Sequence, residues 1–151
     1  MSEFRVLRVG HEWERFDELL DLSYAVLYGP FGVDREAEWY HPANGSEFAI
    51  ALGADGALLG TARLLPVPGD ASRQIRQVVV APSTHGRGVG RALMASLEDI
   101  AIADNAEDLY LHARQSAIGF YERLGYVIEG DEFISELTGI PHRTMRKRLA
   151  R

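Results

Sequence analysis

Cysteine is absent from this 151-residue sequence, and its absence removes several classes of chemistry at once. Without thiols the chain forms no disulfide scaffold, no thiolate zinc site and no cysteine nucleophile. Long apolar runs are missing too: no stretch approaches the roughly 18–20 residues of a membrane span, and the first residues lack the apolar core of a signal peptide. We therefore expect no metal site, no membrane partner and a cytoplasmic location.

Basic residues are outnumbered by acidic ones, 16 to 22, and the formal net charge is -6. This balance argues against a dedicated nucleic-acid binder. Acidic residues are nevertheless missing from residues 71–97, which carry four arginines, whereas residues 1–70 carry 12 acidic and 5 basic side chains. An acid-free window in an acidic chain indicates a local site for an anionic ligand. Chance clustering on a solvated face is the alternative.

No linker, internal repeat or low-complexity tract divides the chain, and about 150 residues suffice for one core, so we expect a single domain over residues 1–151. The Asp55-Gly56 pair between two apolar runs predicts a β-hairpin of strands 48–52 and 57–65, followed by a turn at 66–70. The remaining patterns predict strands at 4–10, 73–80, 109–113, 126–130 and 143–149, and helices at 13–28, 34–40, 87–103 and 115–124, with Asp34 as the cap of the second helix. This order of elements predicts an α/β or α+β fold.

The most informative segment is the loop between the strand at 73–80 and the helix that follows it. Glycine occupies alternate positions 86, 88 and 90, and Arg87 and Arg91 flank the last two glycines. Glycines allow a ligand to approach the backbone closely, and the free N–H groups and positive dipole end of a helix start favour phosphate. The residues that we expect to bind such an anion are His85, Gly86, Arg87, Gly88, Val89, Gly90 and Arg91.

Two common phosphate motifs do not fit this loop. A dinucleotide fingerprint, G-x-G-x-x-G, fails because Arg91 or Leu93 stands where the last glycine is required. A P-loop fails because it needs a lysine, and the one lysine of the chain is Lys147. The loop instead resembles the acyl-CoA loop of the GNAT superfamily of N-acetyltransferases, Q/R-x-x-G-x-G/A. Gly88 and Gly90 match its last two fixed positions, and His85 departs from the usual Arg or Gln at the first.

Two further segments carry the same resemblance. Residues 117–126 are similar to the second GNAT signature, A-x-x-F-Y-E-x-L-G-[FY], and residues 136–145 are similar to the E-x-x-x-I-P-H-x-x-M tail of a bacterial subgroup. The resemblance implies one GNAT-like domain with a mixed, mostly antiparallel central sheet flanked by helices. It also implies transfer of an acetyl group from acetyl-CoA directly to a primary amine of a small molecule or peptide, with a homodimer as a family-level expectation.

The resemblance also assigns roles to residues of the site. It places the backbone donor for the tetrahedral oxyanion, and with it part of the acyl-CoA site, in the strand segment Val78, Val79 and Val80. It places Tyr121 near the thioester sulfur, where a phenol (pKa about 10) protonates a leaving thiolate (pKa about 8.5) as general acid. A thiol acyl-enzyme intermediate is impossible because the chain has no cysteine.

The base that deprotonates the acceptor ammonium is less sharply defined. Glu136 and His142 rank first because the tail pattern includes them, and a water relay without one essential base is equally compatible with the sequence. Other candidates are Glu36, Glu38, His112 and Glu132. Two other classes of function stay open at this stage: a catalytically silent acyl-CoA-binding or sensor domain, and a nucleic-acid module suggested by the basic residues 143–148 but disfavoured by the overall charge.

Overall fold

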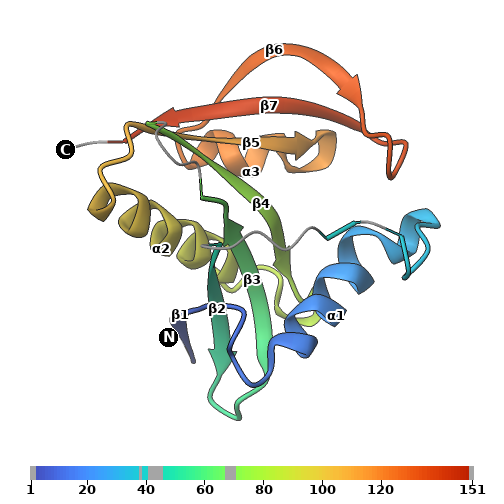
Figure 1. The fold of residues 1–151 in the computed structure, drawn as a ribbon, viewed down its shortest axis with the longest axis vertical. Helices are drawn as coiled ribbons and strands as arrows, with labels where there is room; N and C mark the ends of the chain where they lie inside the picture. The colour runs from blue at the N-terminus through green and yellow to red at the C-terminus, as the bar shows by residue number, and fades with distance from the viewer. Residues whose placement is uncertain (1–2, 38, 41–45, 67–70, 150–151) are drawn as a thin grey trace.

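The computed structural model describes residues 3–37, 39–40, 46–66 and 71–149. They form a seven-stranded sheet in the order β1-β2-β3-β4-β5-β7-β6 (Figure 1). The strands are β1 (Phe4–Val9), β2 (Glu47–Gly53), β3 (Leu58–Leu64), β4 (Ser72–Val80), β5 (Asp108–Arg114), β6 (Val127–Ile134) and β7 (Pro141–Arg148). The helices are α1 (Phe16–Leu27), α2 (Val89–Ala103) and α3 (Ile118–Arg123), with 3-10 turns at Gly29–Phe31, Pro82–Thr84 and Gln115–Ala117.

Every pair of neighbouring strands is antiparallel except β4 and β5, which run parallel. The connection between these two strands is α2, as a parallel crossover requires. The predicted hairpin is confirmed: β2 and β3 pair antiparallel, and Gly56 takes the positive φ of 86° that the turn demands. The structure therefore confirms the expected mixed, mostly antiparallel sheet flanked by helices. Among the described residues, no helix is long and apolar enough to cross a membrane.

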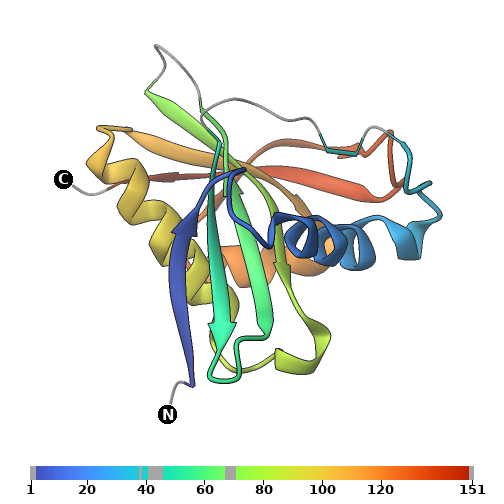
Figure 2. The same cartoon turned by 60° about the horizontal axis from the view of Figure 1, so that its bottom comes forward.

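The alternation of side chains along β2 separates two layers of core. Phe48, Ile50 and Leu52 pack with Leu19 of α1 on one face of the sheet. Ala49 and Ala51 point to the other face and share a core with α2 and α3, where small side chains leave room for the apolar stripe of α2. Helix α1 thus covers the face of the sheet opposite to α2 and α3, as Figure 2 shows.

The helix expected at 34–40 is wrong. The Asp34 carboxylate accepts a hydrogen bond from the Glu36 N–H at 2.9 Å, which closes a local turn instead of capping a helix. Trp39 then enters a small apolar cluster with Tyr28 and Val33 and is only 5% exposed. Burial of this indole overrides the local signal for a helix.

Boundaries of the other elements differ modestly from the expected ones. Helix α1 starts at Phe16 rather than at residue 13, and α3 is shortened by the 3-10 turn that precedes it. Strands β6 and β7 extend to Ile134 and begin at Pro141, so they form a long ribbon at the edge of the sheet. The expected turn at 66–70 lies mostly outside the described residues.

Candidate active site

A bulge interrupts β4 in the middle of the sheet. Arg76 opposes Arg63 of β3, and Val79 opposes Thr61, so two residues of β4 (Gln77 and Val78) face the single residue between them on β3. Gln77 takes a φ of 53°, a left-handed conformation that is uncommon outside glycine. The bulge bends β4 at the point where the acyl-CoA resemblance predicts the reacting carbonyl to lie.

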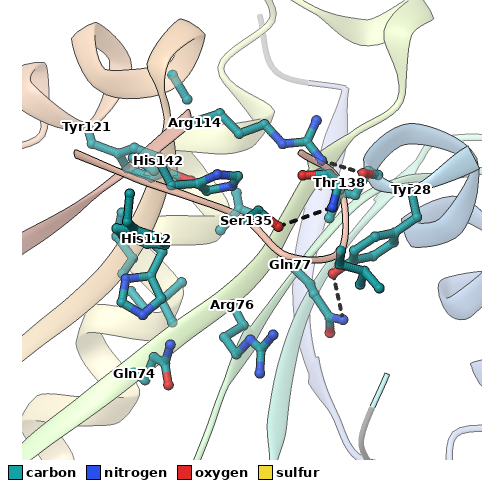
Figure 3. Close-up of a pocket in the computed structure, with 18 of the residues that line it drawn as sticks. Tyr28, Gln74, Arg76, Gln77, His112, Arg114, Tyr121, Ser135, Thr138 and His142 are labelled. Atoms are coloured by element: carbon teal, nitrogen blue, oxygen red, sulfur yellow. Dashed lines mark hydrogen bonds between the residues drawn. The ribbon is translucent and has the colours of Figure 1, made fainter. Parts of the chain in front are cut away.

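The parallel strands β4 and β5 separate beyond a short paired segment. They pair only over Ser72–Gln74 and Asp108–Tyr110, and they diverge from there on (Figure 1). A cavity of about 620 Å³ lies in and beside this split. Its walls come from residues 74–78 of β4, residues 111–114 of β5, the end of α1, Tyr121 of α3, residues 133–138 at the end of β6 and in the loop after it, and His142 of β7 (Figure 3).

The backbone of β4 beyond the bulge is directed alternately toward β3 and toward the split. Ala81 donates its N–H to Leu59 of β3 at 2.8 Å, and Val79 opposes Thr61. Alternation then directs the backbone groups of Val78 and Val80 away from β3, toward the split. His85 agrees with this direction, because its ring Nε2 donates to the Val80 carbonyl oxygen at 3.3 Å. Of the three valines, Val78 lines the cavity and Val79 is buried against β3.

Gln77 anchors the bulge through its side-chain amide. Its Nε2 lies 3.3 Å from the Tyr28 hydroxyl (Figure 3) and donates to the Trp39 carbonyl at 3.1 Å, while its Oε1 accepts from Arg63 at 3.5 Å. Arg63 is itself 2% exposed, donates to Ser46 and stacks on the Tyr40 ring. The strained backbone is therefore held by groups from three separate segments.

The glycine loop leaves β4 at the far end from the paired segment. Gly86 and Gly88 have φ values of 83° and 80°, and no atom lies within 4 Å of a Cβ built on either, so both leave open space at the start of α2. Gly90 differs: a Cβ there would lie 3.2 Å from Phe120 and 3.4 Å from Val80. The first two glycines shape an exposed cradle, and the third allows α2 to pack closely against β4 and α3.

Tyr121 reaches the cavity from α3 and is 8% exposed. Burial raises the pKa of its phenol well above the ordinary value of 10, and the nearby Arg114 guanidinium offsets part of that rise. The phenol is therefore protonated across the neutral and alkaline range. This is the state that a proton donor needs.

The structure brings three of the predicted base candidates to the same cavity: Glu136, His142 and His112. The His142 Nδ1 lies 2.8 Å from the Ile140 carbonyl, which only accepts, so Nδ1 carries a proton, and in a neutral imidazole the lone pair is on Nε2. The Phe133 ring packs against both histidine rings: its centroid lies 5.9 Å from that of His142 and 5.1 Å from that of His112.

The other base candidates are not at the cavity. Glu36 lies in the turn that follows Asp34, and Glu132 is exposed on β6; neither lines the cavity. Glu38 falls outside the described residues.

Sequence reasoning missed several residues of the cavity wall, chiefly Arg76, Gln77 and Arg114. Arg114 donates to the Leu27 carbonyl and stacks over Phe31 at 4.6 Å, which ties β5 to the end of α1. Arg76 and Gln77 stand just before a segment that the sequence did single out. Nothing in their residue types marks a bulge, because glutamine rarely adopts positive φ.

Comparison with known proteins agrees with this geometry. Residues 13–126 match the model of the Acetyltransferase (GNAT) family. The chain belongs to the GNAT family. The match spans the bulged strand, the glycine loop and α3, whereas the cavity residues 133–138 and His142 lie beyond it. The subgroup suggested by the tail at 136–145 stays a prediction.

Solved structures share the GNAT fold over nearly the whole chain. A protein from Lactobacillus plantarum superposes with a TM-score of 0.84 at 22% identity, over 99% of this chain and 100% of that one. An acyl-CoA N-acyltransferase from Pseudomonas aeruginosa gives 0.78 at 25% identity, over 95% and 99%. Streptothricin acetyltransferase of Streptomyces lavendulae is 34% identical over 84 residues, 54% of this chain and 44% of that protein. The chain spans about half the length of the curated relatives it matches.

The residues of this GNAT site fit an acyl-CoA. The cradle offers open backbone at Gly86 and Gly88, beside the exposed Arg87 and Arg91, for the phosphates. The backbone groups of β4 that face the split can form hydrogen bonds with an extended arm of the ligand that contains amide groups, in the way that an added β-strand would. Within the described residues no cluster of three or more metal-ligating side chains occurs.

Proposed function

We propose that this chain transfers an acetyl group from acetyl-CoA to a primary amine, without a covalent enzyme intermediate. One observation carries the proposal: the bulge directs backbone of β4, the strand that leads into the glycine cradle, into a cavity lined by ionisable side chains. The cradle suits the phosphates, and the cavity is large enough for a thioester and a small acceptor. His85, Gly86, Arg87, Gly88, Val89, Gly90 and Arg91 make up the proposed cradle, with Val80 at its entrance.

In the proposed step, the lone pair of the acceptor nitrogen attacks the thioester carbonyl carbon. The oxyanion that forms receives a hydrogen bond from the Val78 N–H, a donor that the bulge orients before reaction. The C–S bond then breaks and the CoA sulfur takes the proton of the Tyr121 phenol. The nitrogen gives up its remaining extra proton to the phenolate, which leaves a neutral amide and a neutral Tyr121. Arg114 stabilises the transient phenolate, since its charge lies near enough to lower the pKa of Tyr121.

The proton of the acceptor ammonium goes to His142 Nε2 in this proposal. The Ile140 carbonyl holds the tautomer that leaves Nε2 free, and the loop residue Glu136 lies in the same wall to attract the ammonium. His112 is a second neutral imidazole of the wall and completes a route to solvent. Burial, followed by the charges of Arg76 and His142, lowers the pKa of His112.

The proposal is tested by calorimetry with acetyl-CoA and by a free-thiol assay over a panel of amines. The assay has no background from the protein, because the chain contains no cysteine. Tyr121→Phe is expected to lower kcat about 10²- to 10⁴-fold while the acetyl-CoA Kd changes little. Gly88→Glu is expected to abolish acetyl-CoA binding, because it adds bulk, negative charge and backbone strain at the cradle.

Two outcomes would contradict this function. Unaltered binding in Gly88→Glu would remove the cradle from the proposal, and full turnover in Tyr121→Phe would remove the phenol from the mechanism. Tight binding of acetyl-CoA with no turnover across the whole panel would favour the silent acyl-CoA-binding domain instead. Gly56→Glu is a matched control, since Gly56 also has positive φ and open space but lies in the β2–β3 hairpin.

A further inference from the structure

Among the charged side chains that line the cavity, positive charges outnumber negative ones. In the part of the chain that the structure describes, these side chains are Arg76, Arg114 and Glu136, together with two histidines. The two arginines and one glutamate leave a formal charge of +1 when both histidines are neutral. A lining of this sign disfavours an acceptor with several positive charges, because like charges repel strongly in a partly desolvated site.

The two arginines differ in the contacts that their side chains make. Arg114 is engaged by the Leu27 carbonyl and the Phe31 ring. Arg76 is exposed, and within the described ranges its guanidinium forms neither an ion pair nor a hydrogen bond. Other arginines of the sheet behave otherwise: Arg73, at the start of β4, pairs with Asp104 at 2.7 Å, and Arg146 of β7 pairs with Asp108 at 2.6 Å. Arg76 is thus a cation left available in the cavity wall.

The position of Arg76 is informative as well. It directly precedes Gln77 in the bulge, two residues before the Val78 N–H that the proposed mechanism uses. Figure 3 shows it along β4 between Gln74 and Gln77, with the loop that carries Ser135 and Thr138 across from them. A group bound by Arg76 would therefore be held a short distance from the reacting carbonyl.

From these observations we infer that the acceptor amine of this chain also carries an anionic group, a carboxylate or a phosphate, and that Arg76 binds it. Arginine presents a planar fork of donors that matches both anions. Glu136, the acidic residue of the lining, serves the ammonium end of the same molecule. The inference rests on the proposed function, since it names the acceptor class for that site, and it makes Arg76 the residue that sets specificity.

The test uses pairs of amines that differ only in the anionic group. 3-Aminopropanoate is compared with 3-aminopropanamide, and 2-aminoethyl phosphate with 2-aminoethanol; 1,3-diaminopropane represents a dication. The carboxylate and phosphate pairs distinguish the two anions. We expect kcat/KM to favour the anionic member of at least one pair by about 10- to 100-fold, the range of a charge-assisted hydrogen bond.

Variants assign that preference to Arg76. Arg76→Gln is expected to remove most of it by raising KM for the anionic amine, with little change for its neutral partner, and Arg76→Lys to restore part of it. Arg5→Gln is the matched control: it makes the same charge change at an exposed position on β1, at the opposite edge of the sheet from β6. Thermal unfolding confirms that each variant is folded.

Three outcomes overturn the inference: equal kcat/KM within both pairs, an equal loss for both members of a pair in Arg76→Gln, or faster turnover of the diamine than of any anionic amine. Absence of turnover for every anionic amine also counts against it when acetyl-CoA binds. Failure of the proposed function is distinguishable, since acetyl-CoA would then not bind in calorimetry or would not be consumed with any class of amine.

Discussion

At an ordinary strand position a glycine variant is less stable than an alanine variant, but at Gln77, in the bulge, we predict the reverse order of stability. Gln77→Ala and Gln77→Gly both remove the side-chain amide and its contacts with Trp39, Tyr28 and Arg63. They differ in the backbone, because Gln77 holds a φ of 53°. Glycine adopts that angle without steric cost, whereas alanine does not. The comparison of the two variants therefore isolates the strain of the bulge.

The magnitudes follow from these contacts. One well-formed hydrogen bond, at 3.1 Å to the Trp39 carbonyl, and two long ones at 3.3 and 3.5 Å are lost in both variants. At about 0.5–1.5 kcal/mol for a typical bond, the shared loss is about 1–3 kcal/mol. Left-handed backbone costs alanine roughly 1–2 kcal/mol. In an ordinary strand glycine would be the less stable by about 0.5–1 kcal/mol. We therefore expect Gln77→Gly to be more stable than Gln77→Ala by about 1 kcal/mol.

Urea denaturation followed by circular dichroism measures both free energies of unfolding. Turnover supplies a second measurement, since Gln77→Gly is expected to retain the bulge, and with it the Val78 donor, better than Gln77→Ala. A Gln77→Ala variant as stable as Gln77→Gly, or more so, would refute the claim that the bulge is strained. Equal turnover of the two variants despite a difference in stability would show that catalysis does not depend on the bulge.

Two further predictions concern packing and pH. Gly90→Val is expected to destabilise the fold by about 1–3 kcal/mol in urea, because a Cβ there already lies 3.2 Å from Phe120; Gly119→Val on α3, where the nearest atom is 3.5 Å away, is the milder control. The lowered pKa of His112 means that the unfolded chain binds its proton more readily. Stability should therefore fall as the pH drops below about 6.5, and His112→Gln should flatten that slope; an unchanged slope would contradict the assignment.

Much of the fold could be predicted from local patterns. Alternation located β1 and β4, the Asp55-Gly56 pair located the hairpin, and the apolar stripe located α2, because each signal depends on neighbours within one turn or strand. The segment after α1 could not be predicted in this way. The helix expected there rested on Asp34 as a cap, but Trp39 packs against Tyr28 and its indole donates to the Arg35 carbonyl at 3.1 Å. A long-range apolar contact decided the conformation there.

Some residues of the candidate site could likewise be predicted from local sequence patterns, and others could not. The glycine spacing and the acid-free charge window located the cradle, and the α3 signature located Tyr121, which does line the cavity. Arg76 also belongs to that acid-free window, but nothing in the sequence placed Arg76 or Gln77 in a cavity wall or marked a bulge. Their roles depend on the register of β4 against β3 and on the separation of β4 from β5, which involve residues more than ten positions away.

The sequence by itself excluded thiol chemistry and located the seven strands and the three helices in their order, because composition and short-range patterns carry these signals. The anion site at the glycine loop stays a prediction of the same kind. Only the tertiary structure decided which side chains share one cavity. Gln74–Val78, His112, Arg114, Tyr121 and His142 converge there because β4 bulges and parts from β5. A bulge and a split between strands are properties of pairing across the sheet, and no single segment of the chain encodes them.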